Sequence, residues 1–327
     1  MIKLFNKNMA LQALLILVVT GLFWGQALAN PQPLPDGDGV LYHLLHQALS
    51  SVPLIAVILA MILVLTEGVL LNLILAGANL VPQTSLLPTL LYIIAASATA
   101  TTITPIILVN IILIACLNRL MLHGTALSIP TQRICNISAL IGLASMISLP
   151  ATVFLLTYLL VAVNYRLYSW RDWAALLLGF MAPYITLVVI LAFTGNIEQW
   201  WQQTINGLLS AGITVNSTSA LKVIADIVLI LIMILALFSL IGRLSEKTVI
   251  LQKNMTTVML FVVGGIAMLF YQQTIPIEPA NFAIPFALCG TILMLPTRPT
   301  ITLSRKKKRT WINDTLLILT ILSALLC

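Results

Sequence analysis

The stretch VILAMILVLTEGVLLNL (residues 57–73) carries a single charged residue, Glu67, in an otherwise almost wholly apolar run. It belongs to an apolar segment at 53–75, which is longer than the roughly 20 residues that a helix needs to cross the hydrocarbon core of a bilayer. A lone carboxylate is costly in that environment and usually faces a bundle interior or a cavity. The stretch therefore predicts a transmembrane helix with Glu67 turned towards other helices.

The whole chain has the same character. Its 327 residues are 60% hydrophobic and 8% charged, with a mean hydropathy of +1.09. Soluble domains carry roughly a quarter charged residues, so this composition excludes a water-soluble fold. Transmembrane β-barrels alternate apolar and polar residues, unlike the continuous apolar runs found here. We therefore predict an all-α, polytopic transmembrane helix bundle that forms one domain over residues 1–327.

Eleven apolar segments are predicted to be helices, although several are shorter than an upright span requires. Two pairs of segments are separated only by the Ser/Thr-rich stretch SATATTITP (97–105) and by Ser148-Leu149-Pro150. Each pair could be two short helices, and the second could also be one long kinked helix. The segments are 10–29, 53–75, 88–101, 105–121, 135–149, 151–165, 173–194, 222–242, 255–271, 280–296 and 311–327.

The first segment has two interpretations. Lysines at the N-terminus, a long apolar run and the small-residue sequence Ala27-Leu28-Ala29 before Asn30 are typical of a cleavable signal peptide. The run is also long enough to be retained as a first transmembrane helix. Both interpretations place Asn30 on the non-cytoplasmic side.

Basic residues give the orientation, because short cytoplasmic loops concentrate Lys and Arg. With a cytoplasmic N-terminus and eleven spans, every basic residue except Lys222 falls on the cytoplasmic side, including the run RKKKR (305–309). The sequence thus predicts a multi-pass protein of a bacterial inner membrane. The net charge of +7 is expected to face anionic membrane lipids, and no nucleic-acid partner is predicted.

Three stretches carry a resemblance to a known family. NLVPQTSLLPTLLYII (79–94), VNIILIACLNRLM (109–121) and residues 137–185, which include the loop YRLYSWRDW (165–173), resemble an uncharacterised family of polytopic inner-membrane proteins of Bacteroidetes. In the family's version of the last motif a proline usually stands where this chain has Leu167. The resemblance implies a helical membrane fold and implies no particular activity.

The stretch PDGDGVLYHLLHQ (35–47) gathers unusual charge after the first segment. Asp36 and Asp38 are spaced so that both carboxylates could approach one cation or one hydroxyl group, and glycines around them permit a tight turn. The following residues are apolar at helical spacing and predict a helix lying along the outer interface. His43 and His46 would share one face of it as substrate-binding residues. Two histidines are too few for a closed metal site, so no metal ligands are assigned, although a divalent metal ion remains a conceivable cofactor.

This order of features resembles the multispanning glycosyltransferases that act on lipid-phosphate sugars at the outer membrane face. The resemblance implies a catalytic Asp36, acting as acid/base or as a metal carboxylate, with Asp38 as its partner. A lipid-linked sugar would be the substrate. The basic residue expected to hold a donor phosphate has only Lys222 as an outward candidate. The alternative is that residues 35–39 are simply a polar turn.

Two further features could bind a substrate. Trp200 and Trp201 lie in a predicted outer loop, where tryptophans usually anchor a protein at the interface; they could also stack on a sugar or lipid. Glu67 could relay protons or bind substrate, or it could form an ion pair with Arg119 or Arg133.

Three function classes remain open. The first is an outer-face glycosyltransferase or polymerase that uses Asp36 and Asp38 on lipid-linked glycans. The second is a secondary transporter or flippase with Glu67 as the coupling site. The third is a non-catalytic scaffold subunit of an envelope complex.

Overall fold

The computed structural model describes residues 9–35, 37, 39–98, 101–121, 129–165, 169–195, 249–272 and 283–294, with short pieces between 197 and 238 and at 274–275. The predicted segment at 311–327 and most of that at 222–242 lie outside this part of the chain. Asp36 and Asp38 also lie outside it.

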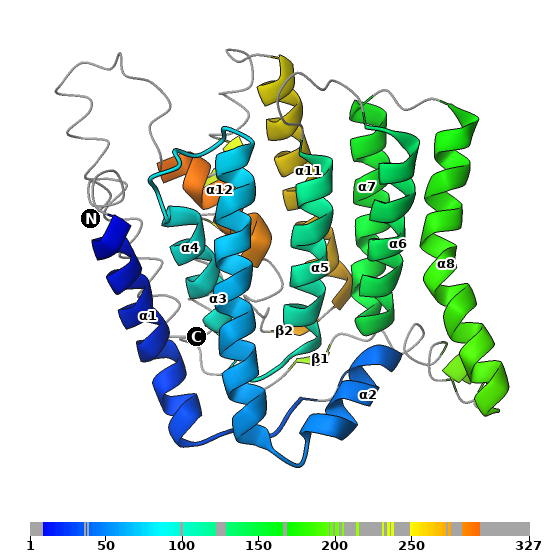
Figure 1. Ribbon diagram of the computed structural model, residues 1–327, viewed down its shortest axis with the longest axis horizontal. Helices are drawn as coiled ribbons and strands as arrows, with labels where there is room; N and C mark the ends of the chain where they lie inside the picture. The colour runs from blue at the N-terminus through cyan, green and yellow to red at the C-terminus, as the bar shows by residue number, and fades with distance from the viewer. Residues whose placement is uncertain are drawn as a thin grey trace.

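The described chain is a bundle of apolar helices, as a membrane protein requires (Figure 1). Four helices are long and apolar enough to cross a bilayer, by length and composition. These four are α1 (Met9–Ala29), α3 (Pro53–Gly77), α8 (Trp170–Thr194) and α11 (Val249–Gln272). The shorter helices are α2 (Val40–Leu49), α4 (Leu87–Ser97), α5 (Pro105–Leu120), α6 (Thr131–Ile147), α7 (Val153–Asn164) and α12 (Ala283–Met294). Two-residue strands, β1 (Thr214–Val215) and β2 (Thr274–Ile275), pair in parallel.

Hydrogen bonds link α7 with α5 and α11, and α6 with α8, at one end of the bundle, at the top of Figure 1. The Tyr165 hydroxyl, at the end of α7, donates to the Leu120 carbonyl at 3.2 Å and lies 2.9 Å from the Thr257 hydroxyl of α11. Thr131 at the start of α6 donates to Asp172 at the start of α8, at 2.7 Å. We call this the basic end, because the four Lys and Arg side chains of the described residues lie there. They are Arg119, Arg133, Arg171 and Lys253.

The chain reverses direction between α6 and α7. Ser148 is extended, with φ −148° and ψ 120°, and a 3-10 turn over Leu149–Thr152 follows it. The Tyr158 hydroxyl then donates to the Ile134 carbonyl at 3.3 Å. Those residues would stand about 36 Å apart along one continuous helix. Two separate helices are therefore confirmed, and the alternative of one kinked helix is wrong.

The first helix is an integral part of the bundle. The Gln12 amide donates to the Thr84 carbonyl at 3.1 Å and accepts from the Leu86 amide at 2.7 Å. The fully buried Trp24 indole donates to the Ser97 hydroxyl at 2.9 Å. These contacts pack α1 against the residues from 84 to 97.

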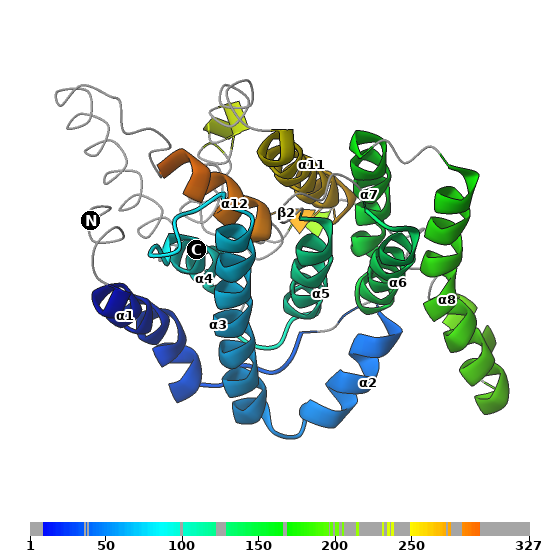
Figure 2. The same ribbon diagram turned by 45° about the horizontal axis from the view of Figure 1, so that its top comes forward.

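Helix α4 is short and enclosed on all sides. Every one of its 11 side chains is buried, and it packs against α1, α3 and α12 (Figure 2). Its length is about 16 Å, against about 30 Å for a bilayer core. The helix predicted over 88–101 thus ends earlier, at Ser97, where the Ser/Thr-rich stretch begins. Ser and Thr side chains compete for backbone hydrogen bonds and so disfavour helix continuation.

Helices α6 and α8 approach each other through two glycines. A Cβ atom on Gly142 would lie 2.6 Å from the Phe180 carbonyl oxygen, and one on Gly179 would collide with the Cys135 carbonyl oxygen. Small residues let membrane helices approach closely and gain van der Waals contact. This pair therefore sets the spacing of α6 and α8.

Candidate functional site

The loop before α2 is packed tightly against the helices above it. A Cβ atom on Gly39 would lie 2.6 Å from the Met146 carbonyl oxygen, and one on Gly37 would lie 2.8 Å from the Pro105 ring. The Tyr42 hydroxyl lies 2.8 Å from the Pro35 carbonyl and 2.9 Å from that of Ile103. The glycines of the acidic motif thus have a packing role, while the aspartates themselves lie outside the described residues.

This packing predicts a strong effect of substitution at Gly39. Gly39→Ala should lower the free energy of unfolding by about 1–3 kcal/mol, because the new methyl group meets the backbone of α6 and not a flexible side chain. Equilibrium unfolding in denaturing detergent measures the change. Gly21→Ala is the matched control, since no atom lies within 4 Å of its added Cβ. Equal stabilities of the two variants would contradict the packing role.

Helix α2 crosses the lower end of the bundle obliquely, as expected of an interface helix (Figure 1). Its inward side carries the buried Tyr42, whose ring lies 6.3 Å from that of His46. His43 is exposed, and Leu44 is 60% exposed. An exposed Leu44 is compatible with the apolar stripe that the sequence predicts to lie in lipid, whereas Tyr42 turns inward because it finds carbonyl acceptors there. The described residues contain no group of three His, Cys, Asp or Glu side chains that could hold a metal ion.

The paired tryptophans follow α8, whose C-cap Gly195 is left-handed at φ 72°. The ring centroids of Trp200 and Trp201 lie 6.3 Å apart, and Trp201 is 57% exposed. Both the interface-anchor and the substrate-stacking interpretation are compatible with this arrangement.

A buried polar cluster joins α3, α4 and α5. Glu67 of α3 is fully buried, and the Tyr92 hydroxyl of α4 donates to its Oε2 atom at 2.6 Å. The Asn110 side chain of α5 hydrogen-bonds the same hydroxyl group. The carboxyl group also faces the backbone of Ile111, but Oε1 has no partner with hydrogen-bond geometry among the described residues. One carboxyl oxygen is therefore left without a hydrogen bond in the centre of the bundle.

The predicted ion pair of Glu67 with Arg119 or Arg133 is not formed. Arg119 lies nine residues beyond Asn110 on α5, about 13 Å along the helix axis. Its side chain is exposed near the basic end, as is that of Arg133. Glu67 therefore pairs with the Tyr92 hydroxyl in place of a cation.

An apolar groove of about 370 Å³ lies between α3 and α5, close to the cluster. Its first residue on α3, Leu70, is one helical turn from Glu67, and Leu73 on its rim is 60% exposed. The groove is lined by Leu70, Leu73, Ile74, Ile111, Ile114, Ala115 and Asn118. It thus opens on the outer surface of the bundle, and its lining begins one helical turn from the buried carboxyl group.

Residues 101–104, which precede α5, have irregular backbone packed within the bundle. Thr102 is 5% exposed and Ile103 is fully buried, and helix resumes only at Pro105. The buried Thr104 hydroxyl has no partner among the described residues. Irregular backbone at membrane depth occurs where it is buried in protein or lines a cavity, and interrupted helices are common at transporter binding sites.

Sequence reasoning found Glu67 but missed its partner. Tyr92 sits in an apolar run and has no pattern that marks it, although a tyrosine in such a run needs a hydrogen-bond acceptor. This requirement for an acceptor is the feature of the sequence that could have identified Tyr92 as a partner of Glu67. No family model, curated protein or solved structure matches the chain, so its function is inferred from the geometry of these sites.

Proposed function

We propose that the protein is a membrane transport protein of the flippase class and that Glu67 is its proton-carrying group. The chain would lie in a bacterial inner membrane with a cytoplasmic N-terminus. It would move an amphiphilic molecule, such as a lipid-linked sugar, across the bilayer in a proton-linked step.

The buried Glu67 carboxyl group carries this proposal. Such a group in apolar surroundings, with no basic partner, must gain or lose a proton or bind a cation when its surroundings change. The Tyr92 hydroxyl of α4 holds the carboxyl group through a hydrogen bond at 2.6 Å, and the Asn110 side chain of α5 hydrogen-bonds that hydroxyl in turn. A movement of α3 against α4 and α5 would therefore be coupled to the protonation of the carboxyl group.

Two neighbouring features support an amphiphilic substrate. The groove between α3 and α5 is apolar and opens on the surface that lipid would cover. Residues 101–104, just before α5, provide polar backbone and threonine groups at the start of a helix that also lines the groove. An acyl or prenyl chain suits the first feature, and a sugar or phosphate group suits the second.

The acidic loop lies below the same helix. Gly37 approaches Pro105, the first residue of α5, and Asn110 follows about 8 Å further along its axis. Asp36 and Asp38 could therefore serve transport as an outer acidic entrance. Their roles as catalytic residues of a glycosyltransferase remain predictions from the sequence.

Reconstitution of the purified full chain in liposomes tests the proposal. A fluorescent phospholipid and a fluorescent polyprenyl-phosphate sugar would serve as probes, with a membrane-impermeant quencher reporting the accessible leaflet. We expect faster transbilayer movement of the lipid-linked sugar than in protein-free liposomes, with a rate that changes when a pH gradient is imposed. Movement of both probes at the protein-free rate, with and without the gradient, would overturn the proposal.

A further inference from the structure

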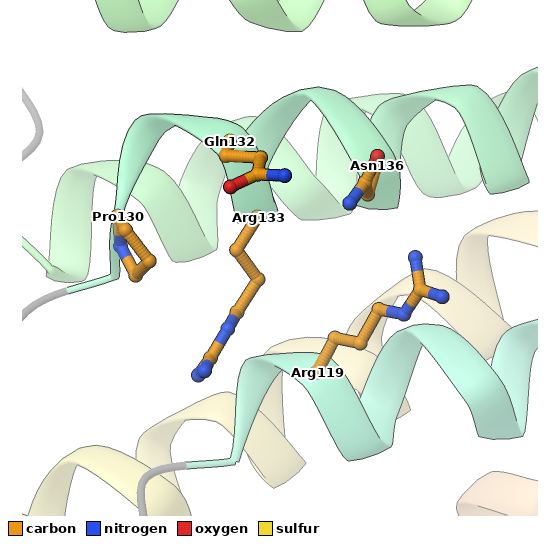
Figure 3. Close-up of a pocket in the computed structure, with 5 residues that line it drawn as sticks. All are labelled: Arg119, Pro130, Gln132, Arg133 and Asn136. Atoms are coloured by element: carbon orange, nitrogen blue, oxygen red, sulfur yellow. The ribbon is translucent and has the colours of Figure 1, made fainter.

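A second site lies at the basic end, between α5 and α6. A pocket of about 330 Å³ separates the end of α5 from the start of α6. Figure 3 shows the Arg119 side chain extending from α5 towards Asn136, and the Arg133 side chain reaching back from α6 towards α5. The pocket is lined by Arg119, Pro130, Gln132, Arg133 and Asn136.

The charge of this pocket is not neutralised by nearby acids. Among the described residues, neither guanidinium group lies within 4.0 Å of a carboxylate. Asp172, at the start of α8, instead accepts a hydrogen bond from Thr131 at 2.7 Å. Two positive charges thus face one pocket, and its other polar side chains in the part of the chain that the structure describes are the amides of Gln132 and Asn136.

The backbone adds to this positive potential. Helix α6 begins after Pro130 without a side-chain cap, so its first turn presents N–H groups that no side chain satisfies. The N-terminal end of a helix carries a partial positive charge that favours anions. Arginines, amide side chains and a helix start therefore converge from two elements on one space.

We propose that this pocket binds a phosphate group, carried either by an anionic phospholipid or by free phosphate. A guanidinium group matches the geometry of phosphate oxygens through paired N–H donors, and two guanidinium groups can hold one phosphate from two sides. Basic pockets between transmembrane helices on the cytoplasmic side are typical sites for anionic headgroups. The site is separate from Glu67, so it does not depend on the proposed transport activity.

Titration of the purified full chain tests this inference, with the thermal unfolding midpoint from tryptophan fluorescence as the readout. Phosphatidylglycerol and inorganic phosphate would be added separately to protein in an uncharged detergent. We expect saturable stabilisation of the wild type. The apparent affinity should fall roughly 30-fold in R119Q/R133Q, since each arginine near an anionic surface contributes about a fivefold factor. If phosphatidylglycerol stabilises the protein and inorganic phosphate does not displace it, the pocket is a lipid site. If only inorganic phosphate stabilises the protein, the pocket is a free-phosphate site.

Two further variants keep the test decisive. Arg171→Gln removes a cation from the same end but outside the pocket, so it should bind the probes as the wild type does. R119K/R133K keeps the net charge and serves as the test variant if R119Q/R133Q does not fold. It should bind the probes about fivefold more weakly than the wild type, because lysine cannot make the paired N–H contacts of a guanidinium group. Wild-type affinity in the variant that folds, or an equal loss in Arg171→Gln, would overturn the inference.

Discussion

Replacement of Gly179 by leucine is expected to lower the free energy of unfolding by about 3 kcal/mol, the upper part of the usual range for an overpacked interior. The added side chain would meet the Ser138 hydroxyl and the Cys135 carbonyl of α6. The carbonyl belongs to the helix backbone and cannot rotate away, so α8 must move as a body. Equilibrium unfolding in denaturing detergent, monitored by tryptophan fluorescence, measures the loss.

Gly25→Leu is the matched control for this experiment. Gly25 also lies in an apolar helix, but no atom lies within 4 Å of its added Cβ, and the residue is exposed. The control should unfold with nearly the wild-type free energy. Wild-type stability in Gly179→Leu would show that α6 and α8 do not depend on close contact at this point.

Glu67→Gln is expected to abolish gradient-driven movement of the lipid-linked probe while the protein remains folded. Glutamine has the size of glutamate, and its carbonyl can still accept the hydrogen bond from Tyr92. It cannot gain or lose a proton, so the link between the pH gradient and the rate should disappear. The measurement is the ratio of the transbilayer rates with and without the gradient, which should fall to one.

Tyr92→Phe separates protonation from positioning. This variant keeps the Glu67 carboxyl group but removes the 2.6 Å hydrogen bond to it. We expect the gradient dependence to survive with a rate about fivefold lower, which corresponds to about 1 kcal/mol for one hydrogen bond. If Glu67→Gln instead responds to the gradient as the wild type does, the buried carboxyl group has a structural role and does not couple transport.

Much of the helix map could be predicted from the sequence, because apolar run length and proline position are local signals. The expected segments 10–29, 53–75 and 105–121 differ from α1, α3 and α5 by at most two residues at either end. Prolines at 53 and 105 set two of those starts, as proline favours the first turn of a helix. The number of true spans could not be predicted in the same way, since helices such as α4 depend on tertiary burial.

The candidate site was predictable only in part. An isolated glutamate in an apolar run requires a polar partner inside the bundle, and this requirement identified Glu67 as a candidate site residue. The partner's identity depends on how α3 and α4 are rotated against each other, which no local pattern encodes. Arginines were plausible partners by charge, yet they lie at helix ends, where long cationic side chains can reach water. The pocket between Arg119 and Arg133 also depends on tertiary structure, because it forms where the last turn of α5 lies beside the first turn of α6.

The enclosure of α4 has a consequence for the biogenesis of the protein. A segment of this length cannot be released sideways from the translocon into lipid as an independent span. It must stay in contact with α1 and α3 until α12, which follows nearly two hundred residues later, is synthesised and packs against its remaining face. Nascent chains that stop before α12 should therefore be recognised by membrane quality-control proteases, whereas chains that extend beyond it should escape them.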